Sequence, residues 1–214
     1  MQTANNSSVA EHGAPPVADI DAALAALREA EAVVFPTETF YGVAVDAMNP
    51  RALDRLFELK GRDPGKPVAL IAADLEMVAR VVAAIPPAAR RLAREFWPGP
   101  LTMVLPARPE LSRALTNREG GVGIRISPHP IALELVRRLG SPLTATSANL
   151  AGDAPARTLH EAWAAFGSRI AAYLDGGTLD APLPSTVIAF HDDDIQVLRA
   201  GAITESRLRD ALPG

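Results

Sequence analysis

The sequence contains no cysteine among its 214 residues. This absence excludes disulfide scaffolds, thiolate metal sites and cysteine nucleophiles. No apolar run approaches the roughly 20 residues that a membrane-spanning helix requires. Residues 1–16 are small and polar, and they lack the apolar core of a secretion signal. We therefore expect a soluble, cytoplasmic protein with no membrane segment.

Aromatic side chains and net positive charge are also scarce. Phe, Trp and Tyr together make up 5% of the residues, and the formal net charge is −4. A protein that binds nucleic acid over its whole surface depends on aromatic stacking and on many Lys and Arg side chains. The composition argues against that class, although it leaves room for a local basic pocket.

Apolar residues, by contrast, are plentiful. Hydrophobic side chains account for 48% of the chain and charged ones for 21%. That balance permits a sizeable core and excludes global disorder. Residues 1–17 contain paired prolines and no apolar periodicity, which predicts a flexible N-terminal tail. At this length we expect residues 18–214 to form a single domain.

Helix and strand patterns alternate along the rest of the chain, which predicts an α/β fold with one main sheet. Two predicted strands near the C-terminus are joined by a short acidic turn, so we expect the sheet to be mixed rather than purely parallel. The predicted helices begin at Asp19, Asn49, Asp74 and Pro86 and cover 130–139, 158–166 and 205–212. The predicted strands cover 32–35, 42–45, 68–72, 101–105, 122–126, 143–146, 185–190 and 195–198.

Three cations stand within seven positions at the end of the second predicted helix. They are Lys60, Arg62 and Lys66, and glycines and prolines between them stiffen the segment. One interpretation is a solvated helix end, where cations offset the helix dipole. The other is an anion site at a sheet edge, where ligands bind in open α/β folds. A P-loop is excluded, because the glycine spacing is one residue short and Pro67 replaces the required Ser or Thr.

Small polar residues follow two of the predicted strands. Thr37 and Thr39 come after the first strand, and Ser147 and Asn149 come after the strand over 143–146. Their hydroxyl, amide and backbone N–H groups suit a polar or phosphorylated small molecule. The same residue types also continue strands or close turns. Ser147 lacks the Gly-x-Ser-x-Gly elbow of the Ser-His-Asp hydrolases.

Two arginines interrupt apolar strands. Arg125 stands within Gly-Ile-Arg-Ile, and Arg199 follows Val-Leu. Each is either a surface arginine of an edge strand or a buried cation that requires an anionic partner. The histidines lack metal-ligand spacing; they stand at positions 12, 129, 160 and 191.

Taken in order, these motifs resemble those of the YrdC-like threonylcarbamoyl-AMP synthases. The similarity runs from about Asp19 to Leu212, and the chain resembles the short members that lack an extra C-terminal domain. The motifs that carry it are Pro36-Thr37-Glu38-Thr39-x-Tyr41-Gly42, Lys60-Gly61-Arg62, Arg125 before a His-Pro, Ser147-Ala148-Asn149, Ser185-Thr186-Val187 and Arg199-x-Gly201.

The resemblance implies an open, twisted, mixed β-sheet with flanking helices around a concave basic cavity. It also implies a nucleotidyltransferase that forms threonylcarbamoyl-AMP and pyrophosphate from L-threonine, bicarbonate (or CO2) and ATP, with Mg²⁺ held mainly through the ATP phosphates. The product serves the threonylcarbamoyladenosine modification of tRNA, and a partner transferase complex moves the group onto tRNA. A weak direct contact with RNA is a further expectation.

The resemblance assigns roles to ten positions. The catalytic residues are Lys60 and Arg62. The ATP-binding residues are Lys60, Arg62, Lys66, Ser147, Asn149 and Arg199. The threonine-binding residues are Thr39, Arg125, Ala145 and Ser185, and the fork of Arg125 suits the amino acid's carboxylate.

The chain departs from the family pattern at two positions. Lys66 precedes Pro67 where many members have Asn, and Ile71 stands where the longer forms have a histidine on the threonine side. Amino-acid selectivity is therefore an open question. Three alternatives also remain: a YciO-like paralogue, an RNA-binding module of the same fold, and a sugar-phosphate enzyme. The last needs a metal-holding set of acids, which the sequence lacks.

Overall fold

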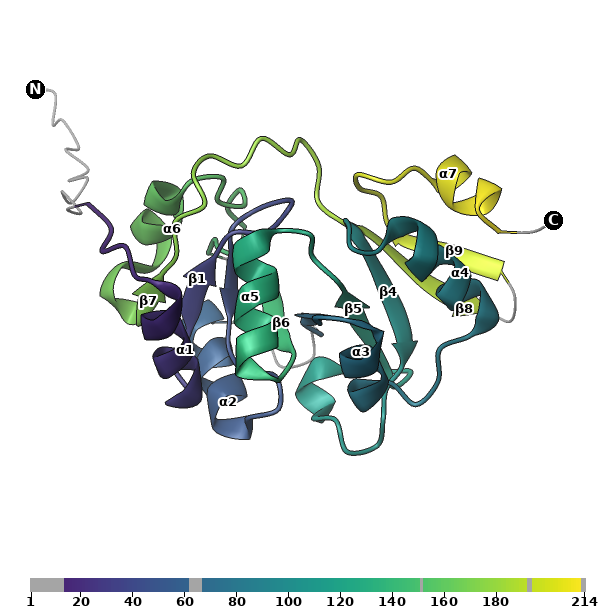
Figure 1. Cartoon of the computed structure of the whole chain (residues 1–214), viewed down its shortest axis with the longest axis horizontal. Coiled ribbons are helices and arrows are strands. Elements are labelled where there is room, and N and C mark those ends of the chain that lie inside the picture. The colour runs from purple at the N-terminus through teal and green to yellow at the C-terminus, as the bar shows by residue number, and fades with distance from the viewer. Residues whose placement is uncertain (1–13, 62–66, 151, 192–193, 213–214) are drawn as a thin grey trace, which may run out of the picture.

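The computed structural model describes residues 14–61, 67–150, 152–191 and 194–212. Within them, nine strands form one sheet in the order β7-β1-β2-β6-β3-β5-β4-β8-β9 (Figure 1). The strands are β1 Val33–Phe35, β2 Gly42–Ala44, β3 Ala69–Ile71, β4 Leu101–Pro106, β5 Gly121–Arg125, β6 Leu143–Ser147, β7 Ala172–Tyr173, β8 Thr186–His191 and β9 Asp194–Arg199. The helices are α1 Ile20–Arg28, α2 Pro50–Lys60, α3 Leu75–Val81, α4 Pro87–Phe96, α5 Pro130–Leu139, α6 Leu159–Phe166 and α7 Glu205–Asp210, with 3-10 turns η1 Arg113–Leu115 and η2 Gly167–Arg169.

The sheet is mixed, as predicted. Three strand pairs are parallel (β1 with β7, β3 with β5, β4 with β8), and the remaining pairs are antiparallel. The outermost strands, β7 and β9, do not meet, so the sheet stays open. Strand β6 lies between β2 and β3 and joins the two halves of the molecule.

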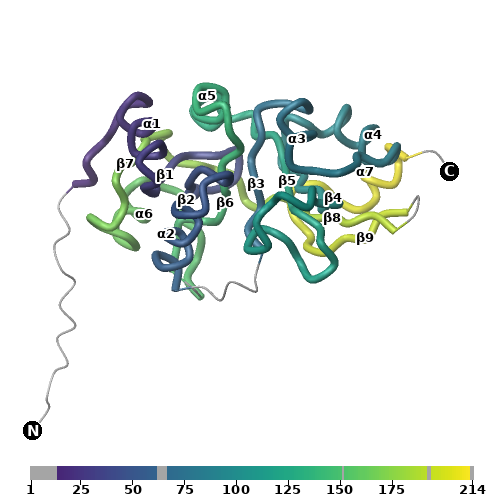
Figure 2. Tube along the Cα trace, turned by 90° about the horizontal axis from the view of Figure 1, so that it is seen from below, coloured from purple at the N-terminus to yellow at the C-terminus, as the bar shows by residue number. Residues whose placement is uncertain are grey.

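The helices cover the two faces of the sheet unequally. Helices α1, α5, α3 and α4 run along one side of the strands, and α2 and α6 lie on the other (Figure 2). The four-helix side is fully packed: Leu70, Ile124, Met103 and Ile188 stand in register across four strands and are 0% exposed. The opposite side chains of the same strands face away from these four helices, because successive residues of a strand point to opposite faces.

Caps determine where several helices begin. Asp19, Asn49, Asp74 and Thr158 each accept a hydrogen bond from a first-turn backbone N–H, which satisfies donors that the helix itself leaves unpaired. Helix α2 ends at Gly61, whose φ of 52° lies in the left-handed region. These helix starts and the eight predicted strands are confirmed.

The N-terminal segment and β7 add one observation beyond the sequence. Residues 1–13 of the predicted tail lie outside the described residues. Val17, at its end, forms an isolated parallel bridge with Tyr173 of β7. Among the described helices, none combines the length and apolar character needed to cross a bilayer.

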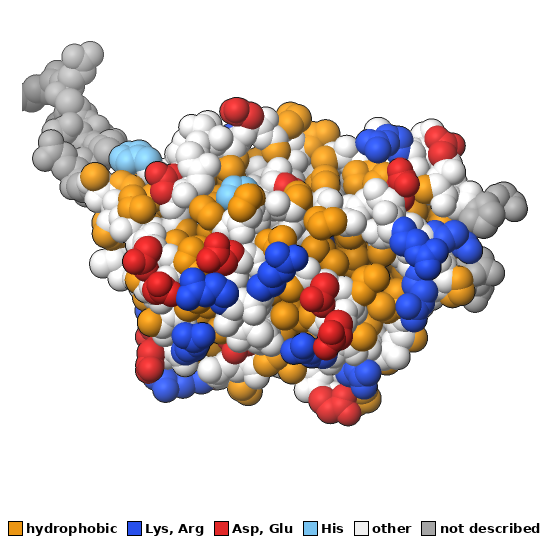
Figure 3. Space-filling view, in the orientation of Figure 1, with side chains coloured by type: hydrophobic (Ala, Val, Ile, Leu, Met, Phe, Trp, Pro, Cys, Tyr) orange, Lys and Arg blue, Asp and Glu red, His pale blue; other side chains and the backbone are white. Residues whose placement is uncertain are grey.

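Side chains of both signs are interspersed on the helix-covered face. Figure 3 shows Lys and Arg beside Asp and Glu over most of that face, with arginines gathering over α4. Arg91, Arg94 and Glu95, all on α4, line one hollow of the surface. No field of one sign covers this view of the molecule, which agrees with the modest net charge.

Candidate functional site

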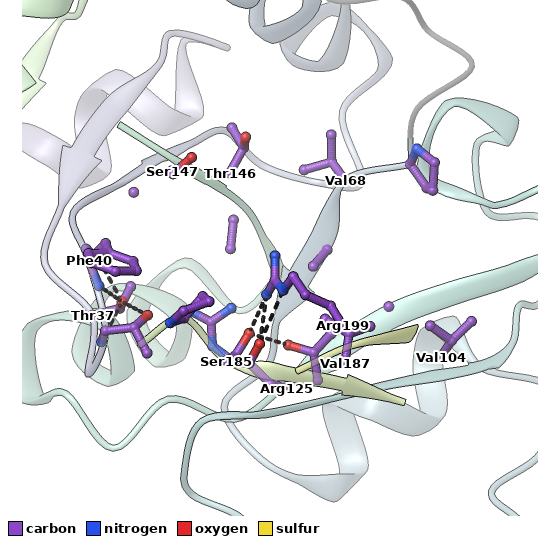
Figure 4. A pocket seen from close by; sticks show the side chains of 18 of the residues that line it. Thr37, Phe40, Val68, Val104, Arg125, Thr146, Ser147, Ser185, Val187 and Arg199 are labelled. Atoms are coloured by element: carbon purple, nitrogen blue, oxygen red, sulfur yellow. Dashed lines mark hydrogen bonds between the residues drawn. The ribbon is translucent and has the colours of Figure 1, made fainter. Parts of the chain in front are cut away.

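A cavity of about 450 Å³ lies against the sheet and extends from β2 to β9 (Figure 4). It lies on the side of the sheet that faces away from α5 and α3. This volume falls within the range of roughly 300–1,000 Å³ that small-molecule sites occupy. Strands β2, β3, β4, β5, β6, β8 and β9 contribute to its walls, together with the turn after β1. The site therefore draws on segments from almost the whole described chain.

The hollow exists because small residues face it. Gly42, Ala69, Gly123 and Ala145 line the cavity from four adjoining strands. The sheet register places Ala69 opposite Ala145. A Cβ added at Gly123 would lie 3.6 Å from that of Ala69, which shows how close these backbones approach. Larger side chains at these positions would occupy the space that a ligand needs.

Arg125 enters the cavity from the end of β5 and is held by a buried carboxylate. Its Nε donates to Oε1 of Glu38 at 2.9 Å, and the side chains of Arg125 and Glu38 are only 8% and 10% exposed. The second carboxylate oxygen of Glu38 accepts a hydrogen bond from Ser127. Within the described part of the chain, no hydrogen bond engages the two terminal nitrogens of Arg125, so they remain for a ligand.

Arg199 enters the same cavity from the end of β9 and is held by Ser185. Its Nη2 donates to the carbonyl oxygen of Ser185 at 2.8 Å and to its Oγ at 2.9 Å, and its Nε donates to the same carbonyl at 3.2 Å. The Ser185 hydroxyl also lies 3.0 Å from that of Thr102 on β4. Figure 4 shows Arg125 and Arg199 directed toward one region.

The two guanidinium groups make the cavity electropositive. They are the charged side chains among the described residues that line it. The pKa of Arg199 is lowered, first by burial and then by the positive charge of Arg125. Two cations that disfavour each other in a partly buried site favour the binding of an anion between or beside them.

The turn after β1 closes on itself through a hydroxyl. Thr37 Oγ1 donates to the carbonyl of Phe40 at 2.7 Å and lies 3.1 Å from the hydroxyl of Thr39. Thr37 therefore stabilises the turn, and Thr39 is the threonine with more capacity for a ligand. Tyr41 follows this turn, and its hydroxyl donates to the carbonyl of Gly177 at 2.7 Å. Burial raises the pKa of Tyr41 to about 12, so the phenol stays protonated.

Lys60 lies at the end of α2 and contacts the loop after β6. Its ammonium donates to the carbonyls of Ser147 and Asn149 at 2.8 and 2.6 Å. Ser147 in turn donates to Oδ1 of Asn149. Lys60 and Asn149 stand just behind the described cavity wall, whereas Ser147 forms part of it. The structure thus brings these three predicted residues together as one cluster.

The remaining predicted residues are distributed as follows. Thr39, Arg125, Ala145, Ser147, Ser185 and Arg199 all line the cavity. Arg62 and Lys66 lie outside the described residues. Ile71 is fully buried and stands opposite Arg125 in the β3–β5 register, so it lies on the cavity side of the sheet beneath the lining.

Glu38, Ser127 and Thr102 are the supporting residues that sequence reasoning missed. Glu38 was visible as a carboxylate between two threonines, but its partner stands 87 positions away. No group of three or more His, Asp or Glu side chains that fits a metal ion occurs in the described residues.

Comparison with known proteins finds both a matching family model and named relatives. A family model of the Sua5, YciO and YrdC proteins, described as "Telomere recombination", matches residues 25–201. The chain is 40% identical over 188 residues to the threonylcarbamoyl-AMP synthase of Bacillus subtilis, covering 87% of this chain and 54% of the relative. It is 34% identical over 193 residues to a putative threonylcarbamoyl-AMP synthase of Mycobacterium tuberculosis, covering 90% and 88%.

A solved structure agrees with these relatives. The crystal structure of Sua5 from Pyrococcus abyssi complexed with L-threonine superposes with a TM-score of 0.86 at 34% identity, covering 90% of this chain and 57% of that one. The chain thus spans little more than half the length of the Bacillus and Pyrococcus proteins. The open mixed sheet and the order of the motifs agree with this match, and the resemblance is confirmed: the chain belongs to the Sua5/YciO/YrdC family.

Proposed function

We propose that this protein is an L-threonylcarbamoyladenylate synthase. The observation that carries the proposal is the pair of arginines, Arg125 and Arg199, held in one hydroxyl-lined cavity of a chain related to named synthases. A carboxylate and a chain of phosphates are the anionic groups of threonine and ATP. Two fixed guanidinium groups in one small cavity suit such a pair of substrates.

The reaction needs positioned charge more than it needs an acid or a base. The threonine amine adds to CO2 and loses a proton, which gives a carbamate. A carbamate oxygen then attacks the α-phosphorus of ATP, and the bond to the β-phosphate oxygen breaks, so that pyrophosphate leaves with the electron pair. Both reactants are anionic, and the barrier therefore consists largely of charge repulsion and misalignment. Fixed cations and hydrogen-bond donors reduce both.

The proposed roles combine the motif assignments with the positions of the side chains around the cavity. Arg125, whose terminal nitrogens face the cavity, binds the threonine carboxylate with Thr39, Ala145 and Ser185 around the amino acid. Arg199 faces the nucleotide.

The cluster at the end of β6 serves the ATP side. Ser147 lines the nucleotide's path, Asn149 and Lys60 stand just behind it, and Arg62 and Lys66 are assigned by motif alone. Mg²⁺ enters with ATP and is held by its phosphates.

Turnover with different amino acids tests the proposal. The protein is incubated with ATP, bicarbonate, Mg²⁺ and either L-threonine, L-serine or L-valine, and pyrophosphate and the carbamoyl adenylate are measured. We expect threonine-dependent release of both products. Arg125→Lys and Arg199→Lys should reduce turnover, whereas Arg91→Lys, an exposed arginine of α4, should not.

Other outcomes would point elsewhere. No release with any amino acid contradicts the proposal and favours a YciO-like paralogue, which the family model includes. Equal release with serine and with threonine contradicts selectivity for threonine. Selectivity is in question because Ile71 stands where the longer family members have a histidine. RNA affinity that falls steeply with salt and does not depend on ATP would favour an RNA-binding module instead.

In the cytoplasm, the product would pass to a transferase complex that acts on tRNA.

A further inference from the structure

Glu38 is a buried carboxylate whose two oxygens serve two different donors. Oε1 accepts from Nε of Arg125, and Oε2 accepts from the hydroxyl of Ser127. The Ser127 hydroxyl also accepts from the backbone N–H of His129, the residue that precedes α5. One side chain thus connects the turn after β1, the end of β5 and the start of α5.

The mode of the Arg125–Glu38 contact is the informative point. An arginine paired with a carboxylate for its own sake commonly uses a bidentate fork of two parallel N–H groups. Here the carboxylate engages only Nε, and its second oxygen turns to Ser127. The two terminal nitrogens of Arg125 therefore stay available on the cavity side. The hydrogen bond from Nε to Glu38 fixes the plane of the guanidinium.

Stability alone does not account for this pair. A buried ion pair pays a large desolvation cost, and apolar replacements of similar volume are often as stable. The negative charge of Glu38 also offsets part of the positive charge of Arg125. This offset reduces the repulsion between Arg125 and the neighbouring Arg199. Glu38 thus affects both the orientation of Arg125 and the balance of charge between the two arginines that face the ligand.

We propose that Glu38 is a positioning residue that sets the guanidinium of Arg125 for the carboxylate of the amino-acid substrate. This inference rests on the proposed function for the identity of the ligand. It makes Glu38 act through Arg125 and not on the reacting atoms.

The variants Glu38→Gln and Glu38→Ala test whether Glu38 orients the guanidinium of Arg125 through its hydrogen bonds. The amide of Gln keeps an acceptor for Arg125 and can donate to the Ser127 hydroxyl where Glu38 accepts from it, whereas Ala offers neither group. We expect Glu38→Ala to raise KM for threonine roughly 10- to 100-fold, the range that loss of an oriented charge-assisted hydrogen bond gives. KM for ATP should change little, and Glu38→Gln should restore most of the threonine affinity.

Glu134→Gln is the matched control, because Glu134 pairs with Arg138 on the exposed surface of α5. A wild-type threonine KM in Glu38→Ala would overturn the proposal. So would a Glu38→Gln variant that is as impaired as Glu38→Ala. A uniform loss of kcat with both KM values unchanged would indicate a structural role only and would also overturn it.

A spectroscopic measurement keeps this test separate from that of the function. The Nε–H resonance of Arg125, assigned with an Arg125→Lys variant, should be protected from exchange in the wild type and in Glu38→Gln, and unprotected in Glu38→Ala. Protection without turnover would sink the proposed function and leave the positioning intact. Turnover with an unprotected Nε–H in the wild type would sink the positioning. If Glu38→Ala fails to fold, Ser127→Ala tests the same network through the threonine KM.

Discussion

At the scale of single residues, position 201 shows how tightly the cavity wall is built. A Cβ at Gly201 would lie 2.4 Å from the carbonyl oxygen of Pro184 and 2.6 Å from backbone atoms of Ser185 and Thr186. These contacts are with backbone, which cannot rotate away. The absence of a side chain at Gly201 therefore allows the segment that presents Ser185 to approach the end of β9, where Arg199 lies.

We predict that Gly201→Ala lowers the free energy of unfolding by about 1–3 kcal/mol, the usual cost of overpacking. The shift of the Ser185 backbone should weaken ligand binding as well. Urea unfolding, followed by circular dichroism, measures the first effect. Gly123→Ala is the control, because its Cβ would meet neighbours only at 3.4 Å or more. A Gly201→Ala midpoint equal to that of the wild type would contradict the prediction.

His129 gives a second prediction at this scale, one that concerns pH. Burial lowers the pKa of His129, against the opposing charge of Glu38, and its Nδ1 is buried without a hydrogen-bond partner. The folded protein therefore disfavours the protonated ring, whereas the ring of the unfolded chain has its ordinary pKa of 6.5. The unfolded state binds more protons below that pH, so stability falls as pH decreases through it.

Replacement of this ring should flatten the acid limb of the stability curve. In His129→Asn, the free energy of unfolding should depend less on pH between about pH 7 and about pH 5 than in the wild type. Urea unfolding at a series of pH values measures the slope. His160→Asn, an exposed position on α6, should leave it unchanged. An identical slope in His129→Asn would show that this residue is not responsible.

At the scale of secondary-structure elements, α2 connects a cap to the site. Asn49 accepts from the backbone N–H groups of Arg51 and Ala52 at the start of the helix, and Lys60 contacts the loop after β6 from its last turn. Fraying of the first turn would loosen the helix that carries Lys60. We predict that Asn49→Ala costs about 1 kcal/mol of stability and that Asn49→Asp costs less. The urea midpoints of the two variants check this, and equal midpoints would contradict it.

Local rules predicted most of these elements because caps, glycines and apolar periodicity act over a few residues. The start of α2 at Asn49 and its end at Gly61 are examples. Strand β7 was missed, because its two residues, Ala172 and Tyr173, carry no turn signal, and their partners in β1 and at Val17 lie far away in the sequence.

The same limit applies to the site. Motifs identified Arg125 and Arg199 as candidate ligands of an anion, and the cavity brings them together. The contacts that orient these side chains span long separations: Glu38 and Arg125 are 87 positions apart, as are Lys60 and Ser147. Such pairs depend on the sheet order, which periodicity does not reveal.

At the scale of the whole molecule, the cavity couples the two halves of the sheet. Its lining comes from β2 and β6 on one side and from β4, β5, β8 and β9 on the other. A ligand bound there contacts both halves and has no comparable site in the unfolded chain. Binding should therefore raise the stability of the entire sheet rather than that of one loop.

We predict that L-threonine together with ATP raises the melting temperature more than either alone. A ligand at about 100 times its Kd adds about 2.7 kcal/mol, which corresponds to a rise of roughly 5–10 °C for a chain of this size. L-Valine, which has the shape of threonine without its hydroxyl, should give a smaller rise. In Arg125→Lys, which lacks the guanidinium fork, the threonine contribution should shrink while that of ATP persists. Thermal scans in each mixture measure these shifts, and equal rises with valine and threonine would place the amino acid away from the hydroxyls of this cavity.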